Sequence, residues 1–162
     1  MARALIVGCG CRGRELGRNL LDSGWAVRGT TREAARCAEI ESAGIEATVA
    51  DPDRAITALD AIDGVTVLCW LLGSAVGSRE ALAAIHGPRL ERVLEEVVDT
   101  PVRGIVYESE GTVAARHREA GERALRAAED RWRIRYEPVT SDPGNHRAWT
   151  AAARAAVDRI VA

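Results

Sequence analysis

The sequence contains no lysine, no phenylalanine and no glutamine, so all 22 of its basic residues are arginine. The absence of lysine excludes a Schiff-base nucleophile, the phosphate-binding lysine of a GxxxxGK[ST] loop and a catalytic Tyr-x-x-x-Lys pair. The abundance of arginine is typical of a GC-rich genome. The number of arginines by itself therefore indicates no function.

Long apolar runs are also missing, since no segment approaches the ~18 uninterrupted apolar residues of a membrane-spanning helix. The apolar run at residues 4–7 is followed by glycine and charge, unlike a secretory signal. A net charge of −2, without interleaved aromatic and basic residues, gives no reason to expect a nucleic acid partner. Four cysteines without paired spacing favour a reducing compartment. We therefore expect a cytoplasmic globular protein that binds neither membranes nor nucleic acid.

Short strand-like segments alternate with helical patterns along the 162 residues. Helical stripes of apolar residues occupy 90–98 and 149–160. Asp22-Ser23-Gly24 and Ala43-Gly44 predict the ends of two further helices. Strands alternating with helices predict a doubly wound α/β fold, with a parallel six-stranded sheet in the order 3-2-1-4-5-6 between two helical layers. The pattern uses residues 1–162 as a single domain and leaves no residues for a separate substrate domain. The six predicted strands are 4–7, 26–29, 46–50, 65–71, 104–107 and 134–139.

Residues 8–13 read GCGCRG, which fits the GxGxxG turn of dinucleotide-binding proteins. The turn follows the first predicted strand and begins the first predicted helix, as that motif requires. Gly8 would allow the tight turn, Gly10 would let a pyrophosphate approach the backbone, and Gly13 would let the helix pack on the sheet. The phosphates, with Cys11 and Arg12 beside them, would bind the helix N-terminus. Alternatively, the glycines serve packing alone.

No carboxylate lies at the tip of the second predicted strand, where residues 28–32 read RGTTR and an NAD site usually has an acidic residue that binds the ribose 2′-OH. The hydroxyls of Thr30 and Thr31 and the guanidinium of Arg32 could instead bind a 2′-phosphate, with help from Arg12. This segment favours NADP over NAD. Alternatively, one of the threonines caps the next helix and Arg32 is solvated.

Three stretches, residues 4–32, 49–53 and 86–113, together resemble the short-chain dehydrogenase/reductase superfamily. More narrowly, they resemble its extended and atypical NAD(P)-binding branch of epimerase and dehydratase relatives. The resemblance implies a Rossmann domain whose cofactor lies across the carboxyl ends of the strands. It places adenine near Asp51, which could equally cap the following helix. It also places Leu71, Leu72 and Gly73 along the cofactor path.

The sequence departs from this superfamily where its catalytic residues would be. Ser109 and Thr112 occupy the region in which relatives polarise the substrate with a Ser or Thr. The Tyr-x-x-x-Lys motif is missing, because residues 114–119 read AARHRE. The usual hydride-transfer machinery is therefore not implied by the resemblance.

Two histidines remain as acid–base candidates, His117 and His146, each near carboxylates at the predicted rim of the sheet. Rim loops are polar in any case, and Asp142 or Asn145 could simply cap the last helix. Cys9 and Cys11 are interpreted as small residues that fill the glycine turn, and Cys37 and Cys69 as buried helix and strand residues. We expect no metal site, because the sequence offers too few further ligands.

Two hypotheses of function follow. The first is a cofactor-binding or sensing module that prefers NADP, with NAD as the alternative, and performs no reaction. The second is an NADP-dependent oxidoreductase or epimerase-like enzyme that acts on a small carbonyl or sugar-type substrate with a non-standard acid. A homodimer is compatible with the stripe at 90–98, since relatives often pair through such helices. The stripe suits packing on the sheet equally well.

Overall fold

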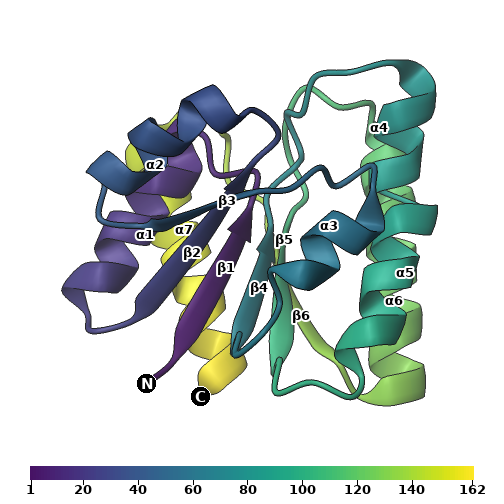
Figure 1. Cartoon of the computed structure of the whole chain (residues 1–162). Helices are drawn as coiled ribbons and strands as arrows, with labels where there is room; N and C mark the ends of the chain where they lie inside the picture. The colour runs from purple at the N-terminus through teal and green to yellow at the C-terminus, as the bar shows by residue number, and fades with distance from the viewer.

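The computed structural model describes residues 1–162, apart from the side chains of Ala55 and Ile56. Six parallel strands form one sheet in the order β3-β2-β1-β4-β5-β6 (Figure 1). The predicted fold class and strand order are confirmed, and the ends of the predicted strands differ from the observed ones by at most two residues. The strands are β1 (Arg3–Val7), β2 (Ala26–Thr31), β3 (Glu46–Val49), β4 (Val67–Trp70), β5 (Gly104–Glu108) and β6 (Arg135–Val139).

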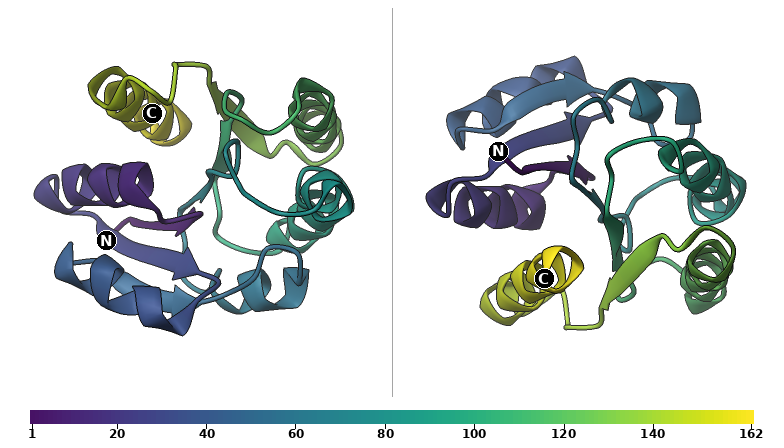
Figure 2. Two further views of the ribbon diagram at one scale, coloured as in Figure 1. Left: turned by 90° about the horizontal axis from the view of Figure 1, so that it is seen from above. Right: turned by 90° about the horizontal axis from the view of Figure 1, so that it is seen from below.

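Helices cover both faces of this sheet (Figure 2). One face carries α1 (Cys11–Asp22), α2 (Cys37–Ser42) and α7 (His146–Val161), with the short 3-10 helix η1 (Ala34–Arg36) leading into α2. The other face carries α3 (Ala55–Asp60), α4 (Arg79–Ile85), α5 (Pro88–Val97) and α6 (Ala115–Trp132). Within the described part of the chain, no helix has the length and apolar character that crossing a bilayer requires.

The core is divided between the two faces because side chains alternate along each strand. Along β5, Val106 packs in the cluster beneath α1 and α7, whereas Ile105 and Tyr107 pack in the cluster beneath α5 and α6. The predicted ends of α1 and α2 are confirmed: Gly24 (φ 88°) and Gly44 (φ 85°) follow them in the left-handed conformation that glycine favours.

Two expectations about buried residues need correction. Val98, which was expected on the apolar stripe of α5, lies at its C-cap and is 41% exposed. The rest of the stripe, Leu90 to Val97, packs on the chain's own sheet. Cys37 was expected to be buried, but it is half-buried at the start of α2. That helix has six residues and buries only Ile40.

Candidate functional site

A cavity of about 610 Å³ lies at the carboxyl ends of the central strands, within the range of about 300–1,000 Å³ typical of small-molecule sites. Its lining comes from the loops that follow β1, β2, β3 and β4, together with β5 and the helices α1, α4 and α7. The predicted cofactor residues on this lining are Gly8, Gly10, Cys11, Arg12, Gly13, Thr30, Thr31, Arg32, Asp51, Leu71 and Leu72.

Backbone conformation and packing explain two of the glycines in the glycine turn. Gly8 has φ 87°, and a Cβ there would lie 2.5 Å from the Leu71 carbonyl oxygen. A Cβ on Gly13 would lie 3.0 Å from the Gly8 carbonyl oxygen and 3.1 Å from Ile6 Cγ2. Gly8 therefore requires glycine whether or not a ligand binds, and packing alone favours glycine at position 13.

Gly10 is different, because neither its backbone conformation nor its packing requires glycine. Its φ is −82°, which any residue adopts, and a Cβ there would meet no described atom within 4 Å. It is the N-cap of α1, and the first turn that follows contains Arg12 and Arg14 but no acidic residue. The positive end of the helix dipole therefore opens into the cavity beside a bare stretch of backbone, as an anion-binding turn requires.

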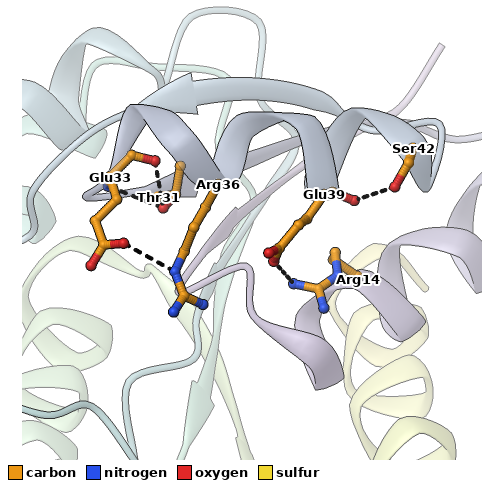
Figure 3. A network of polar contacts seen from close by, with 6 residues as sticks. All are labelled: Arg14, Thr31, Glu33, Arg36, Glu39 and Ser42. Carbon is orange, nitrogen blue, oxygen red and sulfur yellow. Dashed lines mark hydrogen bonds and ion pairs between the residues drawn. The ribbon is translucent and has the colours of Figure 1, made fainter.

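The segment after β2 forms a tight turn at the cavity. The Thr31 hydroxyl oxygen accepts a hydrogen bond from the Glu33 N–H at 3.2 Å, so Thr31 closes a turn and caps no helix (Figure 3). Thr30 is buried, and its carbonyl oxygen accepts from the Cys9 N–H at 3.2 Å. Arg32 Nη2 donates to the Val76 carbonyl oxygen at 3.3 Å, so Arg32 is not simply solvated.

Sequence reasoning missed three charged residues on this part of the wall, Arg14, Glu33 and Arg36. Glu33 Oε2 lies 3.1 Å from Arg36 Nε, while Arg14 Nη1 lies 3.5 Å from Glu39 Oε2 (Figure 3). Because β2 extends to Thr31, two residues beyond the predicted end, Glu33 falls close to the strand tip. The expectation that no carboxylate lies there was wrong, although this carboxylate is paired with an arginine.

Asp51 lies on the cavity wall in a turn of its own. Its Oδ1 accepts a hydrogen bond from the Asp53 N–H at 3.0 Å. The N-cap of the following helix α3 is Arg54, so Asp51 does not cap that helix. This position keeps Asp51 available to a ligand in the cavity.

The loop after β4 is held from both faces of the sheet by two neighbouring residues of β5. On one face, His86 Nε2 lies 3.0 Å from the Leu72 carbonyl oxygen, and His86 Nδ1 lies 2.5 Å from the Tyr107 hydroxyl oxygen. On the other face, Glu108 Oε1 accepts from the Gly73 N–H at 2.8 Å. A Cβ on Gly73 would clash with the Glu110 carbonyl oxygen. Gly73 was expected on the cofactor path but lies behind the cavity wall, pressed against this second loop.

His86 is a fully buried residue whose contacts the sequence did not reveal. A carbonyl can only accept, so His86 Nε2 carries a proton, and the Tyr107 hydroxyl lies between His86 Nδ1 and the Arg118 carbonyl oxygen, 3.2 Å away. Burial lowers the pKa of His86 below its usual value of 6.5, with the nearby His117 and Arg118 acting in the same direction. The lowered pKa favours the neutral ring, whose Nε2–H holds the Leu72 carbonyl.

Glu108, Arg12 and Trp149 meet at the wall of the cavity between β5, α1 and α7. Glu108 Oε2 lies 3.6 Å from Arg12 Nη2, and Arg12 Cζ lies 5.6 Å from the centre of the Trp149 ring. Burial raises the pKa of Glu108, whereas Arg12, the Gly73 N–H and Trp149 act in the other direction. The alternation along β5 could have placed Glu108 on this face, but not its partners.

The structure does not bring the four predicted catalytic residues together. Ser109 is buried, and Thr112 is exposed beside a second cavity of about 360 Å³. His117 lies near the start of α6, whereas His146 begins α7 on the opposite face, with its Nδ1 3.9 Å from Glu15 Oε2. As far as the described side chains define the main cavity, none of the four lines it.

The four cysteines carry free thiols. Burial raises the pKa of Cys9 to about 12, and Cys9 packs against Gly29. Cys11 is exposed on the cavity lining. Among the residues whose side chains are described, no three His, Cys, Asp or Glu residues gather as a metal site would require.

Comparison with known proteins identifies solved structures of similar fold. No family model and no curated protein matches the sequence. Vestitone reductase from alfalfa is 15% identical, with a TM-score of 0.64 over 85% of this chain and 56% of that one. UDP-glucuronic acid 4-epimerase from Bacillus cereus, in complex with NAD, is 13% identical, with a TM-score of 0.63 over 84% of this chain and 55% of that one.

A short-chain dehydrogenase/reductase superfamily protein from Agrobacterium tumefaciens, with bound NAD, is 19% identical, with a TM-score of 0.67. The alignment covers 84% of this chain and 48% of that protein. This chain therefore spans about half the length of the proteins that it resembles. At these identities the likeness shows the fold alone, a Rossmann-like α/β fold that this chain shares with these three proteins.

Proposed function

We propose that this protein is a short-chain dehydrogenase/reductase relative that binds a nicotinamide dinucleotide without the superfamily's Tyr-x-x-x-Lys pair. The observation that carries the proposal is Gly10, a glycine that neither backbone conformation nor packing requires, at the open N-terminus of α1. A pyrophosphate would bind the N–H groups of this first turn, next to Arg12 and Arg14. The two NAD complexes among the fold relatives support the same kind of ligand.

The proposed cofactor is NADP, with NAD as the alternative. Arg14, Arg32 and Arg36 lie on the part of the cavity wall where the adenosine ribose would bind. Among the described residues of this part of the wall, Glu33 is the one acidic side chain. Arg36 neutralises Glu33 by pairing with it. The positive charge of Arg32 therefore favours binding of a 2′-phosphate. Thr31, whose hydroxyl is engaged with Glu33, would contribute less than Arg32.

Calorimetric titration with NADPH and NADH tests both statements. We expect saturable binding of NADPH, and weaker binding of NADH, at micromolar to low-millimolar concentration. Absence of heat with either ligand at millimolar concentration would refute cofactor binding. Equal affinities would refute the NADP preference while leaving the cofactor site in place.

A second candidate function is an enzyme that reduces or epimerises a small carbonyl or sugar-type substrate. The observation in its favour is the second cavity, which shares Ser74 with the main one and is lined by Thr112, Thr140 and Glu110. Hydroxyls and a carboxylate beside a cofactor suit a small polar substrate. Oxidation of NADPH in the presence of simple ketones and aldehydes, measured at 340 nm, would reveal this activity. Its absence would favour the binding module.

A further inference from the structure

Glu108 is a carboxylate buried in the wall of the main cavity, where β5 meets α1 and α7, and it is 1% exposed. Three hydrogen-bond donors are directed at it. The Gly73 N–H donates to Oε1 at 2.8 Å, while the Arg12 guanidinium and the Trp149 indole N–H act as donors to the same carboxylate. A neutral carboxyl would turn an O–H toward these donors, so the arrangement fits the ionised form.

Arg12 is the one cation that lies beside this carboxylate among the described side chains, with its Nη2 3.6 Å from Glu108 Oε2. Other charged side chains of the surrounding elements have neighbours of opposite sign. These pairs are Arg14 with Glu39, Glu15 with His146, Glu110 with Arg118, and Glu137 with Arg159. Tyr107 packs on the opposite face of the sheet. The thiols of Cys9 and Cys69 are uncharged at neutral pH, because burial raises the pKa of each to about 12.

Arg12 also belongs to the first turn of α1, and its side chain is 26% exposed on the cavity lining. A ligand anion at this turn would compete with Glu108 for the guanidinium and would add negative charge beside it. Glu108 cannot follow Arg12 into the cavity, since Oε1 holds the Gly73 N–H. Both effects of the anion therefore disfavour a buried, charged carboxylate.

We propose that binding of an anionic ligand beside Arg12 is coupled to the uptake of a proton by Glu108. The proton comes from the solvent and is taken up by Oε2, because Oε1 stays bound to the Gly73 N–H. Burial raises the pKa of Glu108 while Arg12 opposes the rise, so the negative charge of the ligand acts in the same direction as burial. The complex then holds the proton more tightly than the free protein, and the affinity increases as the pH falls. This regulation rests on the proposed function.

ADP-ribose is the probe, because it carries a diphosphate but no phosphate monoester, whose second pKa of about 6 would add a titration of its own. Calorimetric titrations at pH 7 in Hepes and in Tris give the number of protons taken up per ligand, since the two buffers differ in their enthalpy of ionisation. We expect net uptake of up to one proton by the wild-type protein. Its affinity for ADP-ribose should fall as the pH rises from 6.5 to 8.5, by at most about tenfold per pH unit.

The Glu108→Gln protein should bind ADP-ribose without proton uptake and with an affinity that does not depend on pH. Difference infrared spectra should show the band of a protonated carboxyl when ADP-ribose is added to the wild type, and no such band in this variant. Arg12→Gln should bind more weakly and take up no proton, because Glu108 without its cation is already protonated. Glu137→Gln, which removes a carboxylate paired with Arg159 on the neighbouring strand β6, is the matched control and should behave as wild type. Thermal melts show whether each variant folds.

Binding of ADP-ribose to the wild type without proton uptake would overturn the coupling and leave the proposed function in place. Uptake that persists in Glu108→Gln would assign the proton to another group and would overturn it equally. If Glu108→Gln does not fold, the wild-type proton count and Arg12→Gln still decide the question. Absence of ADP-ribose binding at millimolar concentration would instead refute the diphosphate site, on which both the proposed function and this inference rest.

Discussion

Arg32 Nη2 donates a hydrogen bond to the Val76 carbonyl oxygen at 3.3 Å, although 44 residues separate the two in the sequence. The bond joins the loop after β2 to the loop after β4. Both residues line the main cavity, and Val76 is 78% exposed. The guanidinium is therefore already held at the cavity, on the side where the adenosine ribose is proposed to bind.

Replacement of Arg32 by Ala is expected to weaken NADPH binding by about 1–3 kcal/mol, the scale of hydrogen bonds to a charged group. NADH binding should change little, because NADH lacks the 2′-phosphate. Calorimetric titration measures both. Arg92→Ala, which removes an exposed arginine paired with Glu95 and Glu96 on α5, should leave both affinities unchanged. A parallel loss for NADH and NADPH would contradict the assigned role.

Gly10→Ala separates binding from folding. The added methyl group meets no described atom within 4 Å, so the free energy of unfolding should change by less than about 1 kcal/mol. The same methyl group projects where the pyrophosphate is proposed to lie, and binding of NADPH should fall by tenfold or more, about 1.4 kcal/mol. Urea unfolding and calorimetric titration measure the two effects.

Gly29→Ala provides the converse control. A Cβ there would lie 2.6 Å from Cys9 Sγ and 2.9 Å from Cys9 Cβ, so the substitution should destabilise the fold by about 1–3 kcal/mol. Binding of NADPH to the protein that remains folded should be affected less than in Gly10→Ala. If Gly10→Ala proves as unstable as Gly29→Ala, the turn is a packing device.

The buried His86 should make stability depend on pH. Its pKa is below its usual value of 6.5 in the folded protein, so the unfolded chain binds the proton more readily. His86 therefore does not reduce the free energy of unfolding above about pH 6.5. Below that pH the free energy of unfolding decreases, because the unfolded chain takes up the proton first. Glu108, whose pKa is raised, acts in the opposite sense at lower pH. The free energy of unfolding from urea titrations at pH 7.0 and 5.5 should fall less in His86→Gln than in the wild type. Identical slopes would refute this role.

The four thiols should react at very different rates. Burial raises the pKa of Cys9 and Cys69 to about 12, so neither should react with iodoacetamide at pH 8, where only the thiolate attacks. Cys11 is exposed on the cavity lining and should be alkylated first, followed by the half-buried Cys37. NADPH should slow the reaction of Cys11 and leave Cys37 unchanged. Peptide mass spectrometry measures each site, and equal protection of both would argue against a ligand in this cavity.

The sequence was sufficient for the fold and for the glycine turn, because both depend on short-range patterns. Residues 8–13 carry their motif within six positions, and the six short strand-like segments, several of them purely apolar, define the strands without reference to distant residues. The end of β2 was placed two residues early, at Gly29, since Thr30 and Thr31 resemble turn residues in isolation. That error concealed Glu33 on the cavity wall.

Residues whose roles arise from distant contacts could not be predicted in the same way. Glu108 is significant because Gly73, 35 residues earlier, donates to it, and His86 because the Leu72 carbonyl faces it. The segments around His117 and His146 each combine a histidine with nearby carboxylates, as acid–base sites do. They nevertheless lie on opposite faces of the sheet, which only the order of the helices determines.

The loop after β4 meets two neighbouring residues of β5 from opposite faces, Tyr107 through His86 and Glu108 directly. Such a loop has little conformational entropy left to lose when a ligand arrives. The Gly73 amide proton should accordingly exchange with solvent only when β5 itself opens, a rare event for a strand in the interior of a sheet. This wall of the cavity is preorganised by the fold rather than by its occupant.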